Sequence, residues 1–255
     1  MTTTHLMQLL LALTLHACSP AAEDDDGVVT EVTDVVRGTR DRGRHPAVVA
    51  LVSDLGTLCT GALVAPRVVL TARHCVSVVT PEVDCPSDHA HVLRDLPASA
   101  IAVVTAEDTR GAVYAARGAR TVTFATRNLC GTDAALLVLD RDLRGIVPLD
   151  VDTAATPGPG DLVTAVGYGV RGDSTRAGIG ARYVRAGVRV LRGSRTEFFT
   201  AEGPCSGDSG SPAIDARTGR VVGVLSRGTD RCTGPTAGAM WTRAGVARSL
   251  LERVR

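Results

Sequence analysis

CSGDSGSP, at residues 205–212, is the most specific pattern in this chain of 255 residues. Ser209 lies between Asp208 and Gly210, and Gly207 stands just before them, so the glycines allow a tight turn around a serine. Such a turn points two backbone N–H groups at one spot, as a developing oxyanion requires. Polar turns that contain glycine also occur by chance, so this pattern depends on partners elsewhere in the chain.

Two upstream segments supply those partners. LTARHC, at residues 70–75, places His74 after an apolar, strand-like run and directly before a cysteine. A lone histidine in this setting is more often structural than catalytic. DAALL, at residues 133–137, then provides Asp133 ahead of a second apolar run. The joint occurrence of a histidine, an aspartate and a serine in this order favours nucleophilic catalysis.

These motifs resemble those of the trypsin/chymotrypsin-like serine proteases, of the secreted bacterial type. The resemblance runs from about Val35 to the C-terminal end. The order of the motifs excludes an α/β-hydrolase, and so does Ser211, which stands where the G-x-S-x-G motif of that class needs its second glycine. Three further segments match the family: CTGAL at 59–63, VGYG at 166–169 and GVLSRG at 223–228.

The resemblance implies a role for each residue of the motifs. Ser209 is the expected nucleophile, His74 the general base and then acid, and Asp133 the buried group that orients the imidazole. The amides of Gly207 and Ser209 are the expected oxyanion hole, and Ser226 is expected to hydrogen-bond near Asp133. The implied function is a serine endopeptidase that hydrolyses peptide bonds through an acyl-enzyme. The alternative is a catalytically silent homologue that acts as a binding module at the cell envelope.

Short runs rich in β-branched residues, separated by Gly, Pro and Asp, predict an all-β fold. With the resemblance, we expect two antiparallel six-stranded β-barrels, at about residues 46–150 and 160–243, and a short C-terminal helix at about 244–254. The Pro- and Gly-rich segment 150–160 separates the two units. The expected strands are 47–52, 68–71, 101–105, 121–125, 134–139, 162–166, 184–191, 197–200 and 221–226.

Seven cysteines indicate an oxidising compartment, and their odd number leaves one without a partner. Six of them permit many pairings, so the pairs rest on the resemblance, which joins Cys59 to Cys75 and Cys205 to Cys232. Cys85 and Cys130 are left over, and we predict that they pair.

The seventh cysteine, Cys18, follows an apolar run with the length of a signal-peptide core, so residues 1–17 are expected to be a signal peptide. The box LHAC at 15–18 resembles a bacterial lipoprotein signal, in which a lipid on Cys18 attaches the protein to a membrane. Ordinary cleavage after Ala21 is the competing interpretation. Residues 18–34 are acidic and form an expected tether or propeptide.

Activation and specificity are expected at a few positions. VVRG at 35–38 resembles the family's activated N-terminus, which makes Val35 the partner of Asp208, although Asp34 and Arg37 depart from the family pattern. Gly203 stands where trypsin-like members carry an aspartate for basic substrates, and Gly228 and Ala239 line the same expected pocket, together with Ser226. Small or medium apolar side chains are therefore expected. Arg227 at the rim could favour acidic substrates or be a solvated charge, and it is interpreted as a solvated charge.

Composition excludes other partners. All 28 basic residues are arginines, but the net charge is only +1 and aromatic residues make up 3% of the chain. The lack of a basic excess and of aromatic residues argues against binding to nucleic acids. We expect no cofactor and no metal, since no His or Cys cluster has ligand spacing once the disulfides are assigned. The expected partner is a peptide or protein substrate, and the expected protein is a monomer that is secreted or held at a bacterial cell envelope.

Overall fold

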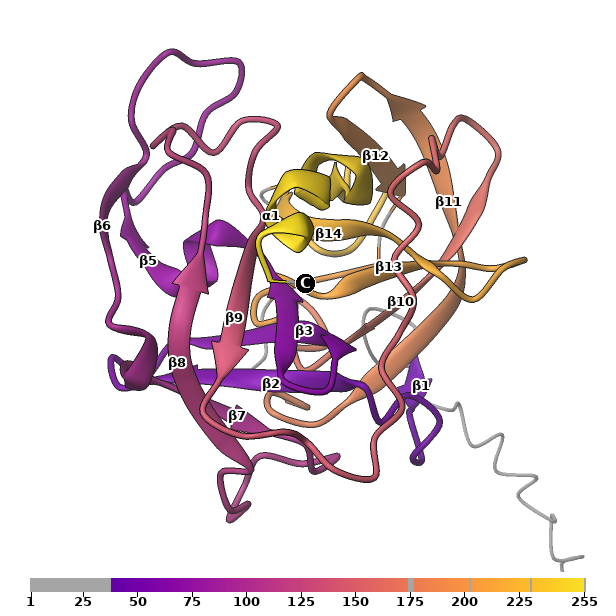
Figure 1. The fold of residues 1–255 in the computed structure, drawn as a ribbon. Helices are drawn as coiled ribbons and strands as arrows, with labels where there is room; N and C mark the ends of the chain where they lie inside the picture. Colours follow the sequence, from indigo (N-terminus) through magenta and orange to yellow (C-terminus); the bar gives the residue numbers. More distant parts are fainter. Residues whose placement is uncertain (1–37, 174–176, 202, 230, 255) are drawn as a thin grey trace, which may run out of the picture. The chain divides into compact units, whose positions relative to one another are not determined.

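The computed structural model describes residues 38–173, 177–201, 203–229 and 231–254. Within them, six antiparallel strands close into a first barrel in the order β2-β3-β4-β9-β8-β7 (Figure 1). Its strands are β2 (Val48–Ser53), β3 (Leu58–Ala65), β4 (Val68–Thr71), β7 (Ile101–Val104), β8 (Ala116–Val122) and β9 (Ala135–Leu139). Pairing of β2 with both β3 and β7 closes this ring.

A second ring of six strands follows in the order β11-β10-β13-β14-β15-β12, and β12 pairs back to β11. A short additional strand, β1 (Thr39–Arg40), pairs with β11 at its edge. The strands of this second barrel are β10 (Leu162–Gly167), β11 (Tyr183–Gly193), β12 (Glu197–Ala201), β13 (Pro212–Asp215), β14 (Val221–Gly228) and β15 (Gly238–Arg243).

The remaining elements are short. A two-stranded sheet of β5 (Ser77–Val79) and β6 (Val92–Asp95) flanks the first barrel, together with two 3₁₀ turns, η1 (Arg73–Val76) and η2 (Ala98–Ala100). The chain then ends in η3 (Ala244–Ala247) and the helix α1 (Arg248–Glu252). Two closed six-stranded barrels and a short C-terminal helix confirm the fold class expected from the sequence.

The two barrels have different cores. Aliphatic side chains such as Leu51, Leu70 and Leu137 fill the first barrel, and all three are at most 1% exposed. In the second barrel Trp241 stacks on Phe198 with 6.1 Å between the ring centroids. Burial of these side chains is the main favourable contribution to folding.

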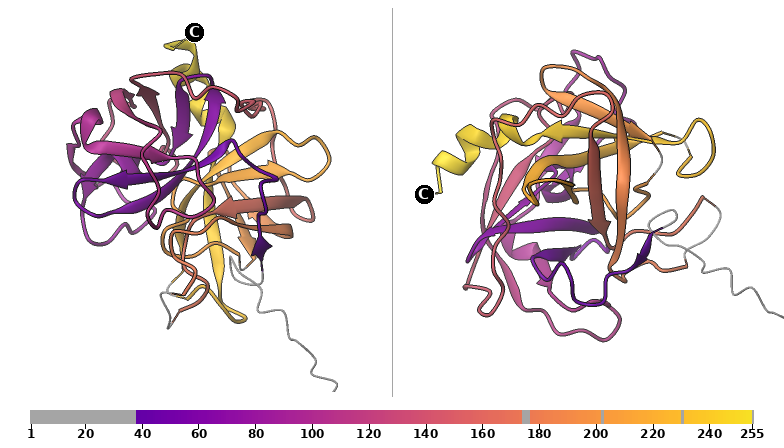
Figure 2. Two further views of the ribbon diagram at one scale, coloured as in Figure 1. Left: turned by 90° about the horizontal axis from the view of Figure 1, so that it is seen from below. Right: turned by 90° about the vertical axis from the view of Figure 1, so that its right-hand side faces the viewer.

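The C-terminal helix crosses from the second barrel to the first. Although α1 follows β15, the side chain of Leu250 is 1% exposed and belongs to the core cluster of the first barrel. Figure 2 shows this yellow helix projecting beside the purple strands. The chain end therefore ties one barrel to the other.

A buried ion pair fastens the start of the described chain to the second barrel. Arg182 Nε lies 2.9 Å from Asp41 Oδ2, and the two residues are 2% and 0% exposed. Arg182 also donates to the hydroxyl of Tyr168 and to the carbonyl of Val48. Because these hydrogen bonds satisfy the charged groups, the pair is tolerated in the interior.

The strand predictions differ from the structure at several places. The expected strand 121–125 is wrong, since β8 covers Ala116–Val122 and its Arg and Gly residues conceal it from a search for apolar runs. The strands β3, β13 and β15 were not predicted, because Gly, Pro or Cys interrupts their apolar pattern.

Candidate functional site

Paired strands bring His74 and Asp133 together. β4 and β9 are antiparallel neighbours, with Thr71 opposite Ala135. His74 lies in η1, directly after β4, and Asp133 lies just before β9. Since the end of one strand meets the start of the other, side chains separated by 59 positions in the sequence become neighbours.

Both oxygens of Asp133 are hydrogen-bonded. Oδ2 lies 2.8 Å from Nδ1 of His74, and Oδ1 accepts the backbone N–H of His74 at 3.0 Å. Ser226, on β14 of the second barrel, donates its hydroxyl to the same Oδ2 at 2.7 Å. Asp133 is 1% exposed, so the barrels together enclose this carboxylate.

Each partner changes the other's pKa. Burial alone lowers the pKa of His74, but the charge of Asp133 and the hydrogen bond to it outweigh this effect, so the pKa is raised. For Asp133, burial acts to raise the pKa, while His74 and the hydroxyl of Ser226 lower it below the ordinary value. The pair is therefore arranged as a carboxylate that stabilises an imidazolium.

Ser209 lies in the turn that precedes β13, and two glycines make this turn possible. Gly207 has φ +96° and Gly210 has φ +81°. A Cβ on Gly210 would lie 2.1 Å from the Thr71 hydroxyl oxygen, and one on Gly207 would lie 2.9 Å from Gly169 Cα. Thr60 on β3 donates its N–H to the carbonyl of Ser209, which fastens the turn to the first barrel.

Two amides of this turn are free. Within the described part of the chain, the N–H groups of Gly207 and Ser209 have no hydrogen-bond acceptor. Backbone N–H groups are strong hydrogen-bond donors, so two unpaired ones in one half-buried turn form a place where a negatively charged oxygen would be stabilised.

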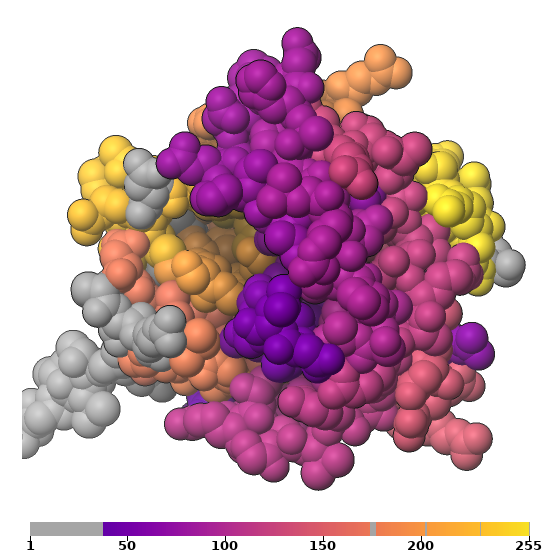
Figure 3. Space-filling model, turned by 90° about the vertical axis from the view of Figure 1, so that its left-hand side faces the viewer, coloured from indigo at the N-terminus to yellow at the C-terminus, as the bar shows by residue number. Residues whose placement is uncertain are grey.

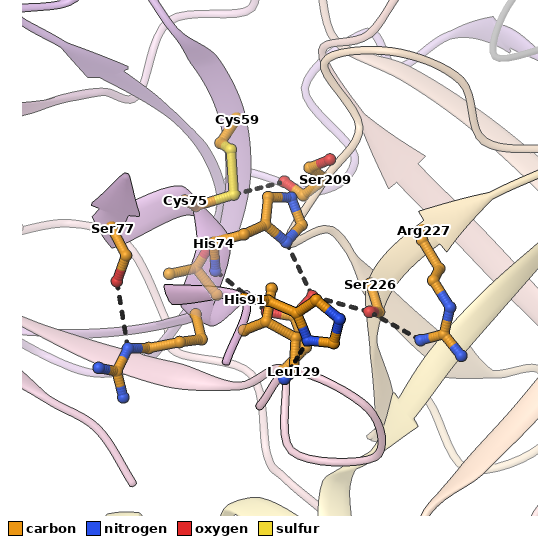
Figure 4. Close-up of polar contacts among 12 residues, drawn as sticks. Cys59, His74, Cys75, Ser77, His91, Leu129, Ser209, Ser226 and Arg227 are labelled. Carbon is orange, nitrogen blue, oxygen red and sulfur yellow. Dashed lines mark hydrogen bonds and ion pairs between the residues drawn. A yellow bond between two sulfur atoms is a disulfide. The ribbon is translucent and has the colours of Figure 1, made fainter. Parts of the chain in front are cut away.

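His74, Asp133 and Ser209 line a single cleft of about 590 Å³. The space-filling view shows the surface hollowed between purple segments of the first barrel and orange-to-yellow segments of the second (Figure 3). The structure has no hydrogen bond between Nε2 of His74 and the hydroxyl of Ser209, although both side chains lie at this cleft (Figure 4). Such a bond is often long or absent without substrate.

A second cavity, of about 150 Å³, adjoins the cleft at Ser209. Gly228 lines it as expected, whereas Gly203 and Ala239 are buried and are not among its lining residues. Ala239 packs in the core of the second barrel, and Ser226 faces the larger cleft instead. The walls of the smaller cavity are otherwise formed by residues 204–206, 225, 227, 229, 231 and 232.

Two arginines line this cavity, of which the sequence placed Arg227 at the rim and did not indicate Arg231. Arg231 lies 3.6 Å from Asp173, and its side chain is 65% exposed. Arg227 was interpreted as a solvated charge, which is wrong, because its side chain is 21% exposed and forms an ion pair with Glu197 at 2.7 Å. Glu197 is another functional candidate that the sequence did not indicate. It is a charged residue at the start of a strand, and the local sequence does not show which residue such a charge pairs with.

Asp208 is buried beneath the serine turn. Its Oδ1 accepts the N–H of Gly169 at 2.8 Å and its Oδ2 accepts the N–H of Cys205 at 2.9 Å. Burial raises the pKa of Asp208 to about 7, and these two hydrogen bonds only partly oppose the rise. Among the described residues Asp208 has no cationic partner. Val35 and Cys18 lie outside the described residues.

Three disulfides surround the site, and they are the pairs expected from the sequence: Cys59–Cys75, Cys85–Cys130 and Cys205–Cys232. The first joins β3 to η1 beside His74, and the third joins the serine turn to the wall of the smaller cavity. Ligand atoms of Cys59, Cys75 and His74 lie within 4.8 Å of one another, but both sulfurs belong to a disulfide, so these residues do not form a metal site.

Two six-stranded barrels that enclose a histidine, an aspartate and a serine in one cleft define the chymotrypsin-like class of proteins. Residues 59–224 match the family described as "Trypsin-like peptidase domain". The chain belongs to this family of trypsin-like serine peptidases.

Named relatives agree with this membership. The chain is 32% identical over 199 residues to the human "Peroxisomal leader peptide-processing protease", covering 77% of this chain and 31% of that protein. It is 32% identical over 203 residues to "Serine protease SP24D" of Anopheles gambiae, covering 72% of this chain and 67% of that protein. The chain thus spans less than a third of the human relative's length.

The solved structure of human heparin binding protein has the same fold. It superposes with a TM-score of 0.64 at 22% sequence identity, covering 86% of this chain and 95% of that chain. Separately, none of the helices in the described part of the chain is both long and apolar enough to span a bilayer.

Proposed function

We propose that this protein is a serine endopeptidase in which Ser209 is the nucleophile, His74 the general base and Asp133 the group that orients it. The observation that carries the proposal is the 2.8 Å contact between His74 and a buried Asp133 at the cleft that Ser209 shares. Membership of the trypsin-like peptidase family supports the same reaction class.

The proposed reaction begins when the hydroxyl oxygen of Ser209 attacks the carbonyl carbon of a peptide bond. Nε2 of His74 takes the hydroxyl proton, and Asp133 stabilises the resulting imidazolium. The carbonyl oxygen becomes an oxyanion and accepts the free N–H groups of Gly207 and Ser209. The C–N bond then breaks, and His74 returns its proton to the leaving amine. Water next attacks the acyl-enzyme with His74 again as the base, which releases the acid product and restores Ser209.

For the substrate, we propose a peptide with a small or medium uncharged side chain in the smaller cavity. A volume of about 150 Å³ suits such a group, since a cavity of this size admits benzene in another protein. Gly228 brings no charge to the cavity, and the nearby guanidinium groups of Arg227 and Arg231 disfavour a basic side chain. Gly203 and Ala239 would contribute from behind the wall of the cavity, where their small size leaves room for the uncharged side chain of the substrate.

For activation, we propose that cleavage before Val35 creates a new N-terminus that binds Asp208. Within the described part of the chain the buried Asp208 forms no ion pair, and a buried carboxylate is costly to ionise. The ammonium group of a new N-terminus at Val35 would supply the missing charge. N-terminal sequencing of active enzyme tests this proposal, and active protein that begins elsewhere contradicts it.

For location, we propose export with removal of residues 1–17, and attachment through a lipid on Cys18. Three disulfides support an oxidising compartment outside the cytosol. Cleavage before Val35 would then release the peptidase from its anchor. Mass spectrometry of the membrane fraction decides between a lipidated Cys18 and a mature chain that starts beyond it. The secreted bacterial subtype stays a prediction, because the relatives named above are animal proteins.

A serine-directed phosphonate tests the central proposal. We expect covalent labelling of the purified, processed protein and none of the Ser209→Ala variant. Absence of Ser209-dependent labelling after processing would instead support the alternative, a silent homologue that binds through the same cleft.

A further inference from the structure

Arg227 follows Ser226 on β14 and lies at the junction of the cleft and the smaller cavity, both of which it lines. Its Nη1 lies 2.7 Å from Oε1 of Glu197, and its Nη2 lies 3.2 Å from Oε2. Contact at two points holds the planar guanidinium in one orientation, unlike the single contact of an ammonium group. Both side chains are largely shielded from water, at 21% and 14% exposure.

The same Nη1 donates to the hydroxyl oxygen of Ser226 at 3.3 Å (Figure 4). A serine hydroxyl has one proton to donate and two lone pairs that accept, whereas a guanidinium only donates. Arg227 therefore occupies a lone pair of Ser226 and leaves its single proton for another acceptor. That acceptor is Oδ2 of Asp133, 2.7 Å away.

Glu197 contacts the loop that precedes Asp133. Its Oε1 accepts the N–H of Gly131 at 3.1 Å, in the loop that leads to Asp133. Glu197 and Arg227 belong to strands of the second barrel, whereas Gly131 and Asp133 precede β9 of the first. The ion pair thus contacts the carboxylate through Ser226 and the backbone through Gly131.

We propose that Arg227 and Glu197 are positioning residues, which act through Ser226 and Gly131 to hold Asp133 against His74. The inference rests on the proposed function, because the two residues would keep the imidazole of His74 aligned for Ser209. It needs no contact between Arg227 and substrate, and it replaces the interpretation of Arg227 as a surface charge.

The decisive experiment is a double-mutant cycle between Arg227→Met and Ser226→Ala, with Glu197→Gln as a third variant. The rate constant for inactivation by diisopropyl fluorophosphate is measured, since this small reagent needs no side-chain pocket. If Arg227 acts through Ser226, Arg227→Met slows inactivation about tenfold in the wild type but less than about twofold in the Ser226→Ala background. Arg192→Met is the matched control, because Arg192 stacks on Phe199 and is exposed.

Loss of one charge leaves the other buried and unpaired, so folding is checked by thermal melting. The double variant Arg227→Met/Glu197→Gln removes both charges and serves where the single variants unfold. Equal slowing by Arg227→Met in both backgrounds, or equal slowing by Arg192→Met, overturns the proposal.

A second readout separates this inference from the proposed function. The pKa of His74 is followed by NMR with labelled histidine, in the same cycle of variants. Glu82 and Asp84 line the same cleft, and Asp208 lies below Ser209, but all three are unchanged throughout the cycle. If the wild-type protein shows no Ser209-dependent labelling, the proposed peptidase function is refuted. Even then, the positioning role stands if Arg227→Met shifts the His74 titration only when Ser226 is present. It falls if the titration is the same in every variant.

Discussion

The hydroxyl of Ser226 donates to Oδ2 of Asp133 at 2.7 Å, and that same oxygen lies 2.8 Å from Nδ1 of His74. One carboxylate oxygen thus joins a strand of the second barrel to the histidine of the first. Because both barrels contribute to this contact, the site exists only when they are packed together.

Asp133→Asn should reduce kcat/KM of the processed enzyme by roughly 10⁴-fold. An asparagine fits the space but presents either a neutral oxygen or an amide to His74, so it neither fixes the tautomer nor stabilises the imidazolium. Steady-state kinetics with a peptide substrate measure the loss. Asp140→Asn, at an exposed position beside Arg141, is the control and should keep full activity. A loss of less than about tenfold would contradict the role given to Asp133.

The raised pKa of His74 predicts the pH dependence of activity. A general base must be neutral, and a higher pKa means that a higher pH is needed to deprotonate the imidazole. Plotted against pH, kcat/KM should therefore rise with a midpoint above the ordinary histidine value of about 6.5. The Asp133→Asn variant should move the midpoint downward, because the negative charge that causes the shift is removed. A wild-type midpoint below 6.5 would argue against His74 as the base.

Much of this site could be predicted from local sequence. The turn around Ser209 requires glycine at positions of positive φ, and His74 and Asp133 each adjoin an apolar strand. Short sequence motifs therefore identify all three of these residues. The pairs Cys59–Cys75 and Cys205–Cys232 followed from the resemblance, and Cys85–Cys130 followed because these two cysteines were left over. The motifs around Ser209, His74 and Asp133, in contrast, each depend on a few residues that are close together in the sequence.

The rest depends on contacts between distant segments. Glu197 and Arg227 are separated by 30 positions, and nothing in either local sequence indicates that the two side chains meet. For the same reason the cavity wall was predicted from Gly203 and Ala239, whereas the structure brings Arg231 to it. The strand β8 was misplaced because Arg117, Gly118 and Arg120 interrupt its apolar residues, so it contains no continuous apolar run.

The pKa of about 7 at Asp208 predicts how the stability of the unprocessed protein depends on pH. The folded pKa lies above the unfolded value of about 3.9, so the folded state binds more protons than the unfolded state between these values. The contribution to stability is fully present below about pH 4 and is lost as the pH rises through 7, by a few kcal/mol.

Thermal melting between pH 4 and 8 measures this loss against Asp208→Asn, which does not titrate. The variant also loses a hydrogen bond, so the comparison concerns the slope with pH and not the absolute melting temperature. Parallel slopes for the two proteins would show that Asp208 does not titrate in this range.

Removal of the Cys85–Cys130 disulfide should destabilise the fold more than removal of Cys59–Cys75. The two bonds close segments of 45 and 16 residues. Loop-closure entropy then predicts losses of about 4 and about 3 kcal/mol, respectively. Urea denaturation of the two double Cys→Ser variants measures the free energies of unfolding. The reverse order would show that native contacts, and not chain entropy, determine the contribution of each bond.

The charges at the smaller cavity predict selectivity for the substrate side chain bound there. A basic side chain would meet the guanidinium groups of Arg227 and Arg231, whose partners Glu197 and Asp173 are not among the residues that line the cavity. Gly228 offers it no carboxylate. An unpaired buried charge costs several kcal/mol, so a valine or alanine substrate should exceed an arginine substrate in kcat/KM by at least about tenfold.

Matched peptides that differ only at this residue provide the measurement. Arg231→Ala should narrow the difference only a few-fold, because Arg231 is 65% exposed and water screens its charge. Turnover of the arginine peptide at the rate of the valine peptide would refute this selectivity, while leaving the roles of Ser209, His74 and Asp133 to be judged by their own variants.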